Sequence, residues 1–176
     1  MEKLYWHNLK STLGAITVCC SDRGVREISL VRGNQARRAK KNQRAISAAY
    51  VEANGQHAPG AKWVRQTVSE LEEYLAGRRR KFTVPLDLRG TAFQERVWNA
   101  LLTIPCGATR SYGEIARQAG NPRAARAVGM ANHDNPIAII VPCHRVIASN
   151  GSLGGYGGGL EVKSRLLRLE QAHRTS

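Results

Sequence analysis

The sequence pattern changes near residue 88, and this change constrains the fold more than any other feature of the chain. Upstream, the spacing of apolar residues indicates strands and one helix, whereas helix-start signals follow one another from Thr91 onward. The chain has 176 residues, which is enough for one large or two small domains. We therefore expect an α+β fold, with a small α/β domain over 1–87 and a mainly helical domain over 88–176.

The N-terminal domain is expected to contain a β-hairpin. Apolar and small polar side chains alternate over 16–21, Asp22-Arg23-Gly24 is a turn signal, and 25–31 predicts the returning strand. A helix face is indicated by apolar residues in a 4-3-4 spacing: Val64, Val68, Leu71 and Leu75. Gly77 is expected to end this helix, and 82–86 predicts a further strand.

Capping boxes predict the starts of two helices in the C-terminal domain. The first box pairs Thr91 with Gln94, and the second pairs Ser111 with Glu114. The second helix is expected to end at Gly120.

A third helix is predicted over 123–131, with Pro122 in its first turn. Together with the preceding helix it gives the pattern of a helix-turn-helix. Arg123 and Arg126 can meet phosphates, and the small residues between them let a backbone approach another surface closely. Two packed core helices would show the same small residues. The formal net charge of +14 favours DNA as the partner.

The cysteines indicate in which kind of cellular compartment the protein works. There are four of them, and none forms the Cys-x-x-Cys spacing of a zinc site: Cys19, Cys20, Cys106 and Cys143. The sequence shows neither a secretory signal nor an apolar run long enough to span a membrane. We therefore expect free thiols in a reducing compartment, namely the cytoplasm, or the nucleus in a eukaryote.

A candidate nucleophile lies in Pro142-Cys143-His144-Arg145, directly after a predicted buried strand over 137–141. A histidine can promote formation of the reactive thiolate. Adjacent side chains diverge in a strand or helix, so a water bridge or a sharp turn would be needed. Glu170, on the predicted last helix, could orient the imidazole. Taken alone, the pair fits a buried structural cysteine beside a surface histidine better than a nucleophile and its base.

The wider pattern resembles the O6-alkylguanine-DNA alkyltransferase family over about 86–171. The resemblance is carried by Asn135-Pro136, Val141-Pro142-Cys143-His144-Arg145-Val146, Gly154-Gly155-Tyr156, Lys163, Phe93-Gln94, Val97-Trp98, Ile104-Pro105, Ser111-Tyr112 and Arg123-Ala124-Ala125-Arg126-Ala127-Val128. The N-terminal hairpin resembles the family more weakly, and 32–60 matches nothing we can name. The resemblance implies a ribonuclease H-like N-terminal domain and a winged-helix-like second domain.

The resemblance also implies a chemistry. Cys143 would accept a methyl or larger alkyl group from O6-alkylguanine, and also from O4-alkylthymine, in a single irreversible displacement. His144 would deprotonate the thiol through a water, and Glu170 would hold His144. Asn135 would fix the active-site turn, and Tyr112 would protonate or hydrogen-bond the leaving guanine. No cofactor is implied.

Further roles follow from the same resemblance. The damaged base must flip out of the duplex, and Arg126 would fill the gap. The backbone of Cys143 and the substrate-binding residues would surround the guanine: Val146, Tyr156, Gly157 and Gly158. Four more residues would contact DNA: Arg123, Ala125, Ala127 and Ser111. We expect a monomer that binds double-stranded DNA containing alkylated guanine and does not bind membranes.

Departures from the family pattern concern four residues. Ser21 and Arg26 occupy two positions where some members bind a structural zinc, so no metal is expected. Gly157 stands where some members have a serine, which leaves only a backbone amide to contact the guanine oxygen. Gly158 stands where some have a large aromatic residue, so the alkyl pocket should be open.

Three other functions fit part of the pattern. A non-enzymatic binder of damaged DNA would lack the acceptor cysteine. A thiol hydrolase using Cys143 and His144 would turn over repeatedly and would not need a basic helix-turn-helix. A transcriptional regulator would need a sensor or dimerisation segment, and we find none in the sequence.

Overall fold

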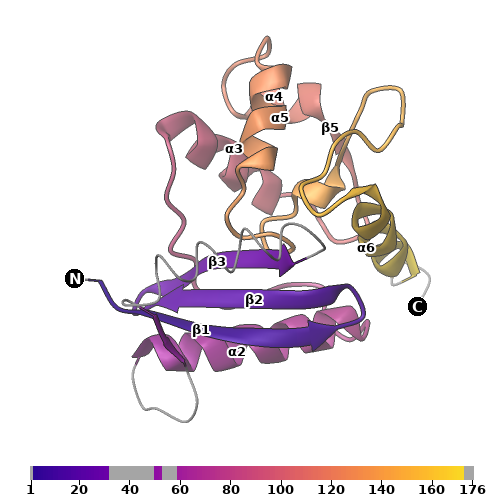
Figure 1. Ribbon diagram of the computed structural model, residues 1–176. Helices are drawn as coiled ribbons and strands as arrows, with labels where there is room; N and C mark the ends of the chain where they lie inside the picture. Colours follow the sequence, from indigo (N-terminus) through magenta and orange to yellow (C-terminus); the bar gives the residue numbers. More distant parts are fainter. Residues whose placement is uncertain (1, 32–49, 53–58, 173–176) are drawn as a thin grey trace. The chain divides into compact units, whose positions relative to one another are not determined.

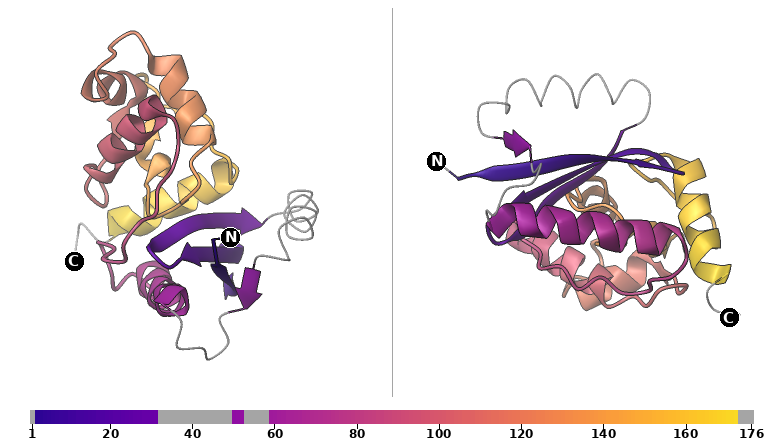
Figure 2. Two further views of the ribbon diagram at one scale, coloured as in Figure 1. Left: turned by 90° about the vertical axis from the view of Figure 1, so that its left-hand side faces the viewer. Right: turned by 90° about the horizontal axis from the view of Figure 1, so that it is seen from below.

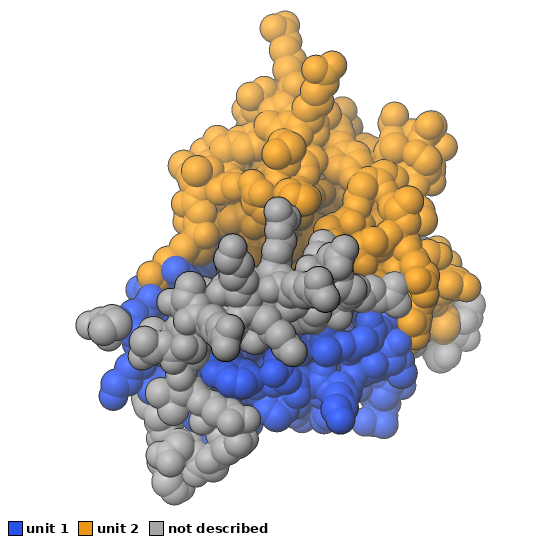
Figure 3. Space-filling view, in the orientation of Figure 1, with its two compact units in different colours: residues 1–88 blue, residues 89–176 orange. Residues whose placement is uncertain are grey.

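The computed structural model describes residues 2–31, 50–52 and 59–172. The chain divides into two compact units, Met1–Leu88 and Arg89–Ser176, shown in different colours in Figure 3. This division lies one residue beyond the boundary expected from the sequence. Each unit is described by itself, and the whole basic segment from Arg32 to Ala45 lies outside the described residues.

In its described residues, unit 1 is a four-stranded sheet with one helix against a face (Figure 1). The strand order is β3-β2-β1-β4, with β1, β2 and β3 antiparallel and β4 parallel to β1. The elements are β1 Leu4–Ser11, β2 Gly14–Ser21, β3 Gly24–Val31, β4 Tyr50–Glu52 and α2 Pro59–Leu75. Figure 2 shows α2 running along the sheet, and its buried residues Val64 and Leu71 contribute to the core.

The hairpin predicted from the period-2 pattern is confirmed as β2 and β3. Ile16, Val18 and Cys20 are all fully buried, and Gly24 at the turn has a φ of 151°. A Cβ at Gly24 would lie 2.3 Å from the Pro85 carbonyl oxygen, so this close approach requires glycine. The sequence-based reading missed β1, where only Tyr5 and Leu9 are buried.

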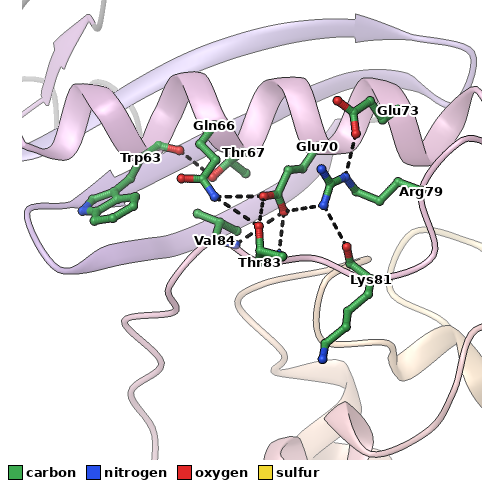
Figure 4. A network of polar contacts seen from close by, with 9 residues as sticks. All are labelled: Trp63, Gln66, Thr67, Glu70, Glu73, Arg79, Lys81, Thr83 and Val84. Carbon is green, nitrogen blue, oxygen red and sulfur yellow. Dashed lines mark hydrogen bonds and ion pairs between the residues drawn. The ribbon is translucent and has the colours of Figure 1, made fainter.

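The strand predicted over 82–86 is wrong, and Glu70 explains why. The buried Glu70 carboxylate accepts hydrogen bonds from Thr83 N at 2.8 Å, Thr83 Oγ1 at 2.5 Å and Gln66 Nε2 at 2.9 Å (Figure 4). The Glu70 side chain therefore binds the backbone N–H of Thr83, which would otherwise be available to pair with a neighbouring strand. The segment keeps a single bridge, between Val25 and Leu86.

The two positions that depart from the family's zinc pattern contact a common carboxylate. Ser21 Oγ donates to Asp87 Oδ2 at 2.7 Å, and Arg26 Nη1 lies 3.5 Å from the same oxygen. Across the described residues, no three His, Cys, Asp or Glu side chains are grouped as a metal site would require.

Unit 2 is mainly helical (Figure 1). Its elements are α3 Ala92–Leu102, β5 Arg110–Ser111, α4 Tyr112–Gln118, α5 Ala125–His133, the 3₁₀ helix η1 Cys143–Arg145, β6 Val146–Ile147 and α6 Leu160–Ala172. Strands β5 and β6 pair in parallel. Where the chain is described, no helix has both the length and the apolar character needed to cross a membrane.

Both predicted capping boxes are confirmed. The Thr91 hydroxyl accepts a hydrogen bond from Gln94 N, and the Ser111 hydroxyl accepts one from Glu114 N. In return, the Gln94 and Glu114 side chains accept from the backbone N–H of Thr91 and Ser111. The third helix needs correction, because α5 begins at Ala125 and Pro122 lies in the preceding turn.

The strand predicted over 137–141 is wrong in a way that matters for the site. This apolar run is buried but folds into consecutive turns, with Val141 N bonded to Ile137 O at 3.0 Å. Ile139 has a φ of 73°, which is rare for a β-branched residue and stores strain. The chain therefore enters Pro142 from a tight arc and not from an extended strand.

Candidate active site

The Asn135 side chain stabilises the arc over 137–141, which precedes Pro142 and Cys143. Its Oδ1 accepts from Ile137 N at 3.0 Å, and its Nδ2 donates to Val141 O at 2.8 Å and to Cys143 Sγ at 3.1 Å. One side chain thus spans both ends of the arc and also contacts the thiol. This geometry agrees with the positioning role expected for Asn135.

The Cys143 thiol lies in an environment that favours the protonated form. Its side chain is buried, and burial raises the pKa of the thiol above its ordinary value. The Asn135 amide, the Lys163 charge and backbone N–H groups oppose this rise. Since only the thiolate is a good nucleophile, a base is needed at neutral pH.

His144 is suited to act as that base. Burial lowers the pKa of its imidazole, although Glu170 opposes this effect, so the ring is neutral at pH 7. His144 Nε2 lies 2.8 Å from Glu170 Oε1, and both side chains are fully buried. Because Glu170 engages Nε2, Nδ1 is the nitrogen that can exchange a proton toward Cys143.

Glu170 also pairs with Arg145. Arg145 Nε and Nη2 donate to its two oxygens at 2.9 and 2.8 Å, and Gly107 N donates at 2.9 Å. Burial alone would raise the pKa of Glu170, but hydrogen bonds from His144 and Arg145, together with the charge of Arg145, hold it well below its ordinary value. The carboxylate therefore stays ionised and fixes the imidazole.

Lys163 is a fully buried cation on α6. Its ammonium donates to Val146 O at 2.6 Å, to Leu153 O, and to Gly155 O at 3.4 Å. Burial lowers its pKa to about 8, and the charge of a Cys143 thiolate would act in the opposite direction. Lys163 thus ties the glycine-rich loop, residues 151–159, to β6 and places a positive charge near the thiol.

A pocket of about 470 Å³ opens onto Cys143. Its lining comes from α4, α5, η1 and the glycine-rich loop: Tyr112, Gly129, Met130, Asn132, His133, Cys143, Gly155, Tyr156 and Gly157. Burial raises the pKa of both Tyr112 and Tyr156, and a charge on Cys143 would raise each further, so both phenols remain protonated. Gly154 has a φ of 64°, and a Cβ there would lie 2.8 Å from the Tyr112 hydroxyl.

The pocket brings together some of the residues expected from the sequence. Tyr112, Cys143, Tyr156 and Gly157 line it, whereas Val146 and Gly158 are not among the lining residues. Val146 is buried in β6, where its carbonyl binds Lys163.

The expected DNA-contacting residues lie around α4 and α5. Arg123 and Arg126 are exposed, as is Ala127, while Ala125 and Ser111 are half-buried. Arg126, Gly129, Met130 and His133 follow helical i, i+3, i+4 and i+7 spacing, which places them on one face of α5. That face continues from the arginine to the pocket lining.

Two residues of the site had little or no signal in the sequence. In the sequence, Arg145 and Lys163 contribute only to the family resemblance, and neither has a predicted role in the site. A basic residue usually indicates solvent exposure, so neither burial was foreseen. A lysine between Val162 and Leu166, both on the apolar face of the last helix, was the available signal.

The arrangement defines a class: a helix-turn-helix protein that keeps a protonated thiol in a pocket, backed by a neutral imidazole and an ionised carboxylate. Comparison with known proteins gives the family. Residues 92–172 match the family model described as 6-O-methylguanine DNA methyltransferase, DNA binding domain, and residues 4–88 match its ribonuclease-like domain. The chain belongs to the 6-O-methylguanine DNA methyltransferase family.

Individual relatives agree. A methylated-DNA–protein-cysteine methyltransferase of Mycobacterium bovis is 56% identical over 131 residues, or 74% of this chain and 79% of the relative. One from Methanosarcina acetivorans is 43% identical over 167 residues, covering 95% and 98%. The crystal structure of Mycobacterium tuberculosis OGT in complex with DNA matches with a TM-score of 0.81 and 43% identity, covering 96% of this chain and 94% of that one.

Proposed function

We propose that this chain repairs DNA by moving an alkyl group from O6 of guanine to Sγ of Cys143. The observation that carries the proposal is the Cys143 thiol in the pocket, with Asn135 on its sulfur and the buried His144–Glu170 pair next to it. Relatives named for transfer from methylated DNA to a protein cysteine support it. The crystal structure of a relative in complex with DNA supports DNA as the partner.

The proposed reaction is one displacement. The thiol proton passes through a bridging water to Nδ1 of His144, and Glu170 stabilises the imidazolium. Sγ attacks the alkyl carbon from the side opposite O6, so the C–S bond forms as the C–O bond breaks. Guanine leaves with the electron pair of that bond, and the Tyr112 hydroxyl supplies a hydrogen bond or the proton that neutralises it. A thioether does not hydrolyse readily, so each molecule acts once.

DNA engagement is proposed to centre on α5. The target atom is paired and stacked inside a duplex, so the nucleotide must leave the stack. The exposed Arg126 fills the vacated space, while Arg123 and the cap at Ser111 contact the backbone. Ala125 and Ala127, which have the smallest side chains available besides glycine, let α5 approach the DNA closely.

We further propose that the substrates are O6-alkylguanine and, less readily, O4-alkylthymine, and that the protein works as a monomer. Arg126 and the reacting residues all belong to one unit of one chain. A reducing compartment such as the cytoplasm would keep the Cys143 thiol available, since a disulfide there would block transfer.

The test is intact-mass measurement after incubation with a duplex that contains one O6-methylguanine. One added methyl per molecule, on the peptide that carries Cys143, is expected, and Cys143→Ala should abolish it. Cys20, a buried thiol whose pKa burial raises to about 12, offers a matched control as Cys20→Ala. Repeated turnover, or a methyl on Cys19, Cys20 or Cys106, would contradict the proposal.

A further inference from the structure

A run of consecutive basic residues follows helix α2 in unit 1. Its members are Arg78, Arg79, Arg80 and Lys81. No acidic residue occurs in the sequence between Glu73 and Asp87. Charges of one sign at such close spacing repel one another, and an anionic partner would relieve that repulsion. The run is therefore a candidate for binding an anion.

Arg79 serves the fold of unit 1. Its Nε donates to Glu73 Oε2 at 2.8 Å, and its Nη1 lies 3.7 Å from Glu70 Oε2 (Figure 4). The same Nη1 donates to Lys81 O at 3.0 Å, and Arg78 N donates to Glu73 O at 2.8 Å. Two acids of α2 thus hold the middle of the run, and they compensate the charge of Arg79.

The segment after the run is held by α2 as well. Thr83 N and Oγ1 both donate to the Glu70 carboxylate. Burial alone would raise the pKa of Glu70, but hydrogen bonds from Gln66 and Thr83, together with the Arg79 charge, lower it. The carboxylate is therefore ionised at neutral pH. Because contacts with α2 fix the backbone of 78–83 on both sides, this segment needs little ordering when it binds a partner.

The other three basic side chains extend into solvent. Arg78, Arg80 and Lys81 are exposed. Figure 4 shows the Lys81 side chain pointing away from α2, whereas its carbonyl group faces Arg79. The run thus presents basic side chains from a fixed backbone, and such side chains neutralise the phosphates of nucleic acids.

We propose that Arg78, Arg80 and Lys81, named here the basic loop, form a second DNA contact, which binds the phosphate backbone from unit 1. DNA is the expected polyanion, because residues 92–172 match a DNA-binding domain. Lys81 lies eight positions before Arg89, the first residue of unit 2. A chain of that length spans at most about 29 Å, and a short tether makes the second contact intramolecular once unit 2 is bound.

This inference requires that the chain binds DNA, but not that Cys143 accepts an alkyl group. A contact with phosphates alone carries no sequence information. The basic loop should therefore add affinity equally at any sequence, and its contribution should weaken as salt rises, since phosphate neutralisation releases counterions.

The experiment measures binding to an undamaged duplex of about 20 base pairs, or two helical turns, by fluorescence anisotropy. KCl is varied from about 50 to 200 mM. The parent is compared with a triple variant, Arg78→Gln/Arg80→Gln/Lys81→Gln. Each phosphate contact contributes about 0.9 to the slope of log K against log salt, so the slope of the triple variant should be smaller by about 2–3.

A matched control removes the same number of charges elsewhere in unit 1, at exposed positions of β1 and α2: Lys3→Gln/Lys10→Gln/Lys62→Gln. Its slope should change by less than about 0.5, because charges more than about 8 Å from the DNA are largely screened at physiological salt. Lys81→Gln alone should lower the slope by about 0.9. It replaces the triple variant if thermal unfolding shows that the triple variant does not fold, since only the carbonyl of Lys81 binds Arg79.

The outcomes separate the second contact from the proposed function. A parent-like slope in the triple variant would overturn the proposal in favour of a solvated loop or of another anionic partner. An equal fall in the control variant would also overturn it, because net charge alone would then explain the binding. If the slopes change as expected but the parent transfers no methyl from O6-methylguanine, the proposed function fails and the second contact stands.

Discussion

Glu170→Gln tests the centre of the site, because it removes one negative charge and changes almost no volume. Four donors converge on the two carboxylate oxygens: His144 Nε2, Arg145 Nε and Nη2, and Gly107 N. A glutamine offers one oxygen to these donors and turns an N–H group toward the others. The substitution therefore leaves the Arg145 guanidinium buried without its counter-charge.

The magnitude follows from burial. Glu170 is 0% and Arg145 8% exposed, so solvent screens this pair little. Breaking a buried ion pair by removing one partner costs about 3–5 kcal/mol. For a unit of this size each kcal/mol lowers Tm by about 4–8 °C, so the transition of unit 2 should fall by about 12–40 °C.

The assay is thermal unfolding followed by calorimetry, with Glu161→Gln as the control on the exposed face of α6. The control should change Tm by less than about 5 °C, since surface substitutions have small effects. Adding Arg145→Met to Glu170→Gln should recover part of the loss, because the orphaned charge is then gone. A Glu170→Gln shift below about 4 °C, or no recovery in the double variant, would refute the reasoning.

Other substitutions and conditions test the remaining parts of the mechanism. Because the pKa of His144 lies below its ordinary value, the transfer rate should stay constant as pH falls from 7.5 to 6.5 and decline only at lower pH; a midpoint above 6.5 in a pH–rate profile would contradict this. Lys163→Met should slow transfer at least about tenfold through loss of the loop contacts and of charge near the thiol, whereas a rate within twofold of the parent would show that Lys163 is dispensable. Arg126→Ala should impair repair in duplex DNA at least about tenfold more than reaction with free alkylguanine, and equal losses would assign Arg126 to the fold. Gly158 follows the pocket-lining Gly157, so a large side chain in Gly158→Trp should reach the pocket and block transfer from O6-benzylguanine; unchanged benzyl transfer, or a parent that ignores this substrate, would contradict an open pocket.

The elements that the sequence predicted correctly are those specified by neighbouring residues. Each capping box is a local exchange of hydrogen bonds across three residues, so the Thr91 and Ser111 helix starts could be read directly. The hairpin around Gly24 likewise depends on a turn and on alternation. Residue chemistry suggested Cys143 and Glu170 as candidates, and the family resemblance decided for their functional roles over a structural cysteine.

The two strand predictions that are wrong, over 137–141 and 82–86, have a common physical cause. In each, a side chain outside the segment forms hydrogen bonds with its backbone. The run from Ile137 to Val141 has strand composition, but the Asn135 side chain bends it into an arc. The 82–86 segment has strand composition too, but the Glu70 carboxylate binds its amides. Both partners lie outside the apolar run that each one binds: Asn135 is two residues before Ile137, and Glu70 is 13 residues before Thr83.

The placement of Glu170 and Lys163 on α6 also orders the assembly of the site in time. During synthesis, Cys143 leaves the ribosome before the helix that carries these two residues. The cap-initiated helices α3 and α4 depend on local contacts and can form early, but Gly107 and Glu170 lie 63 positions apart. A nascent chain that has just exposed Cys143 therefore lacks Glu170 and Lys163, and we expect its thiol to become reactive toward alkylguanine only after α6 has docked.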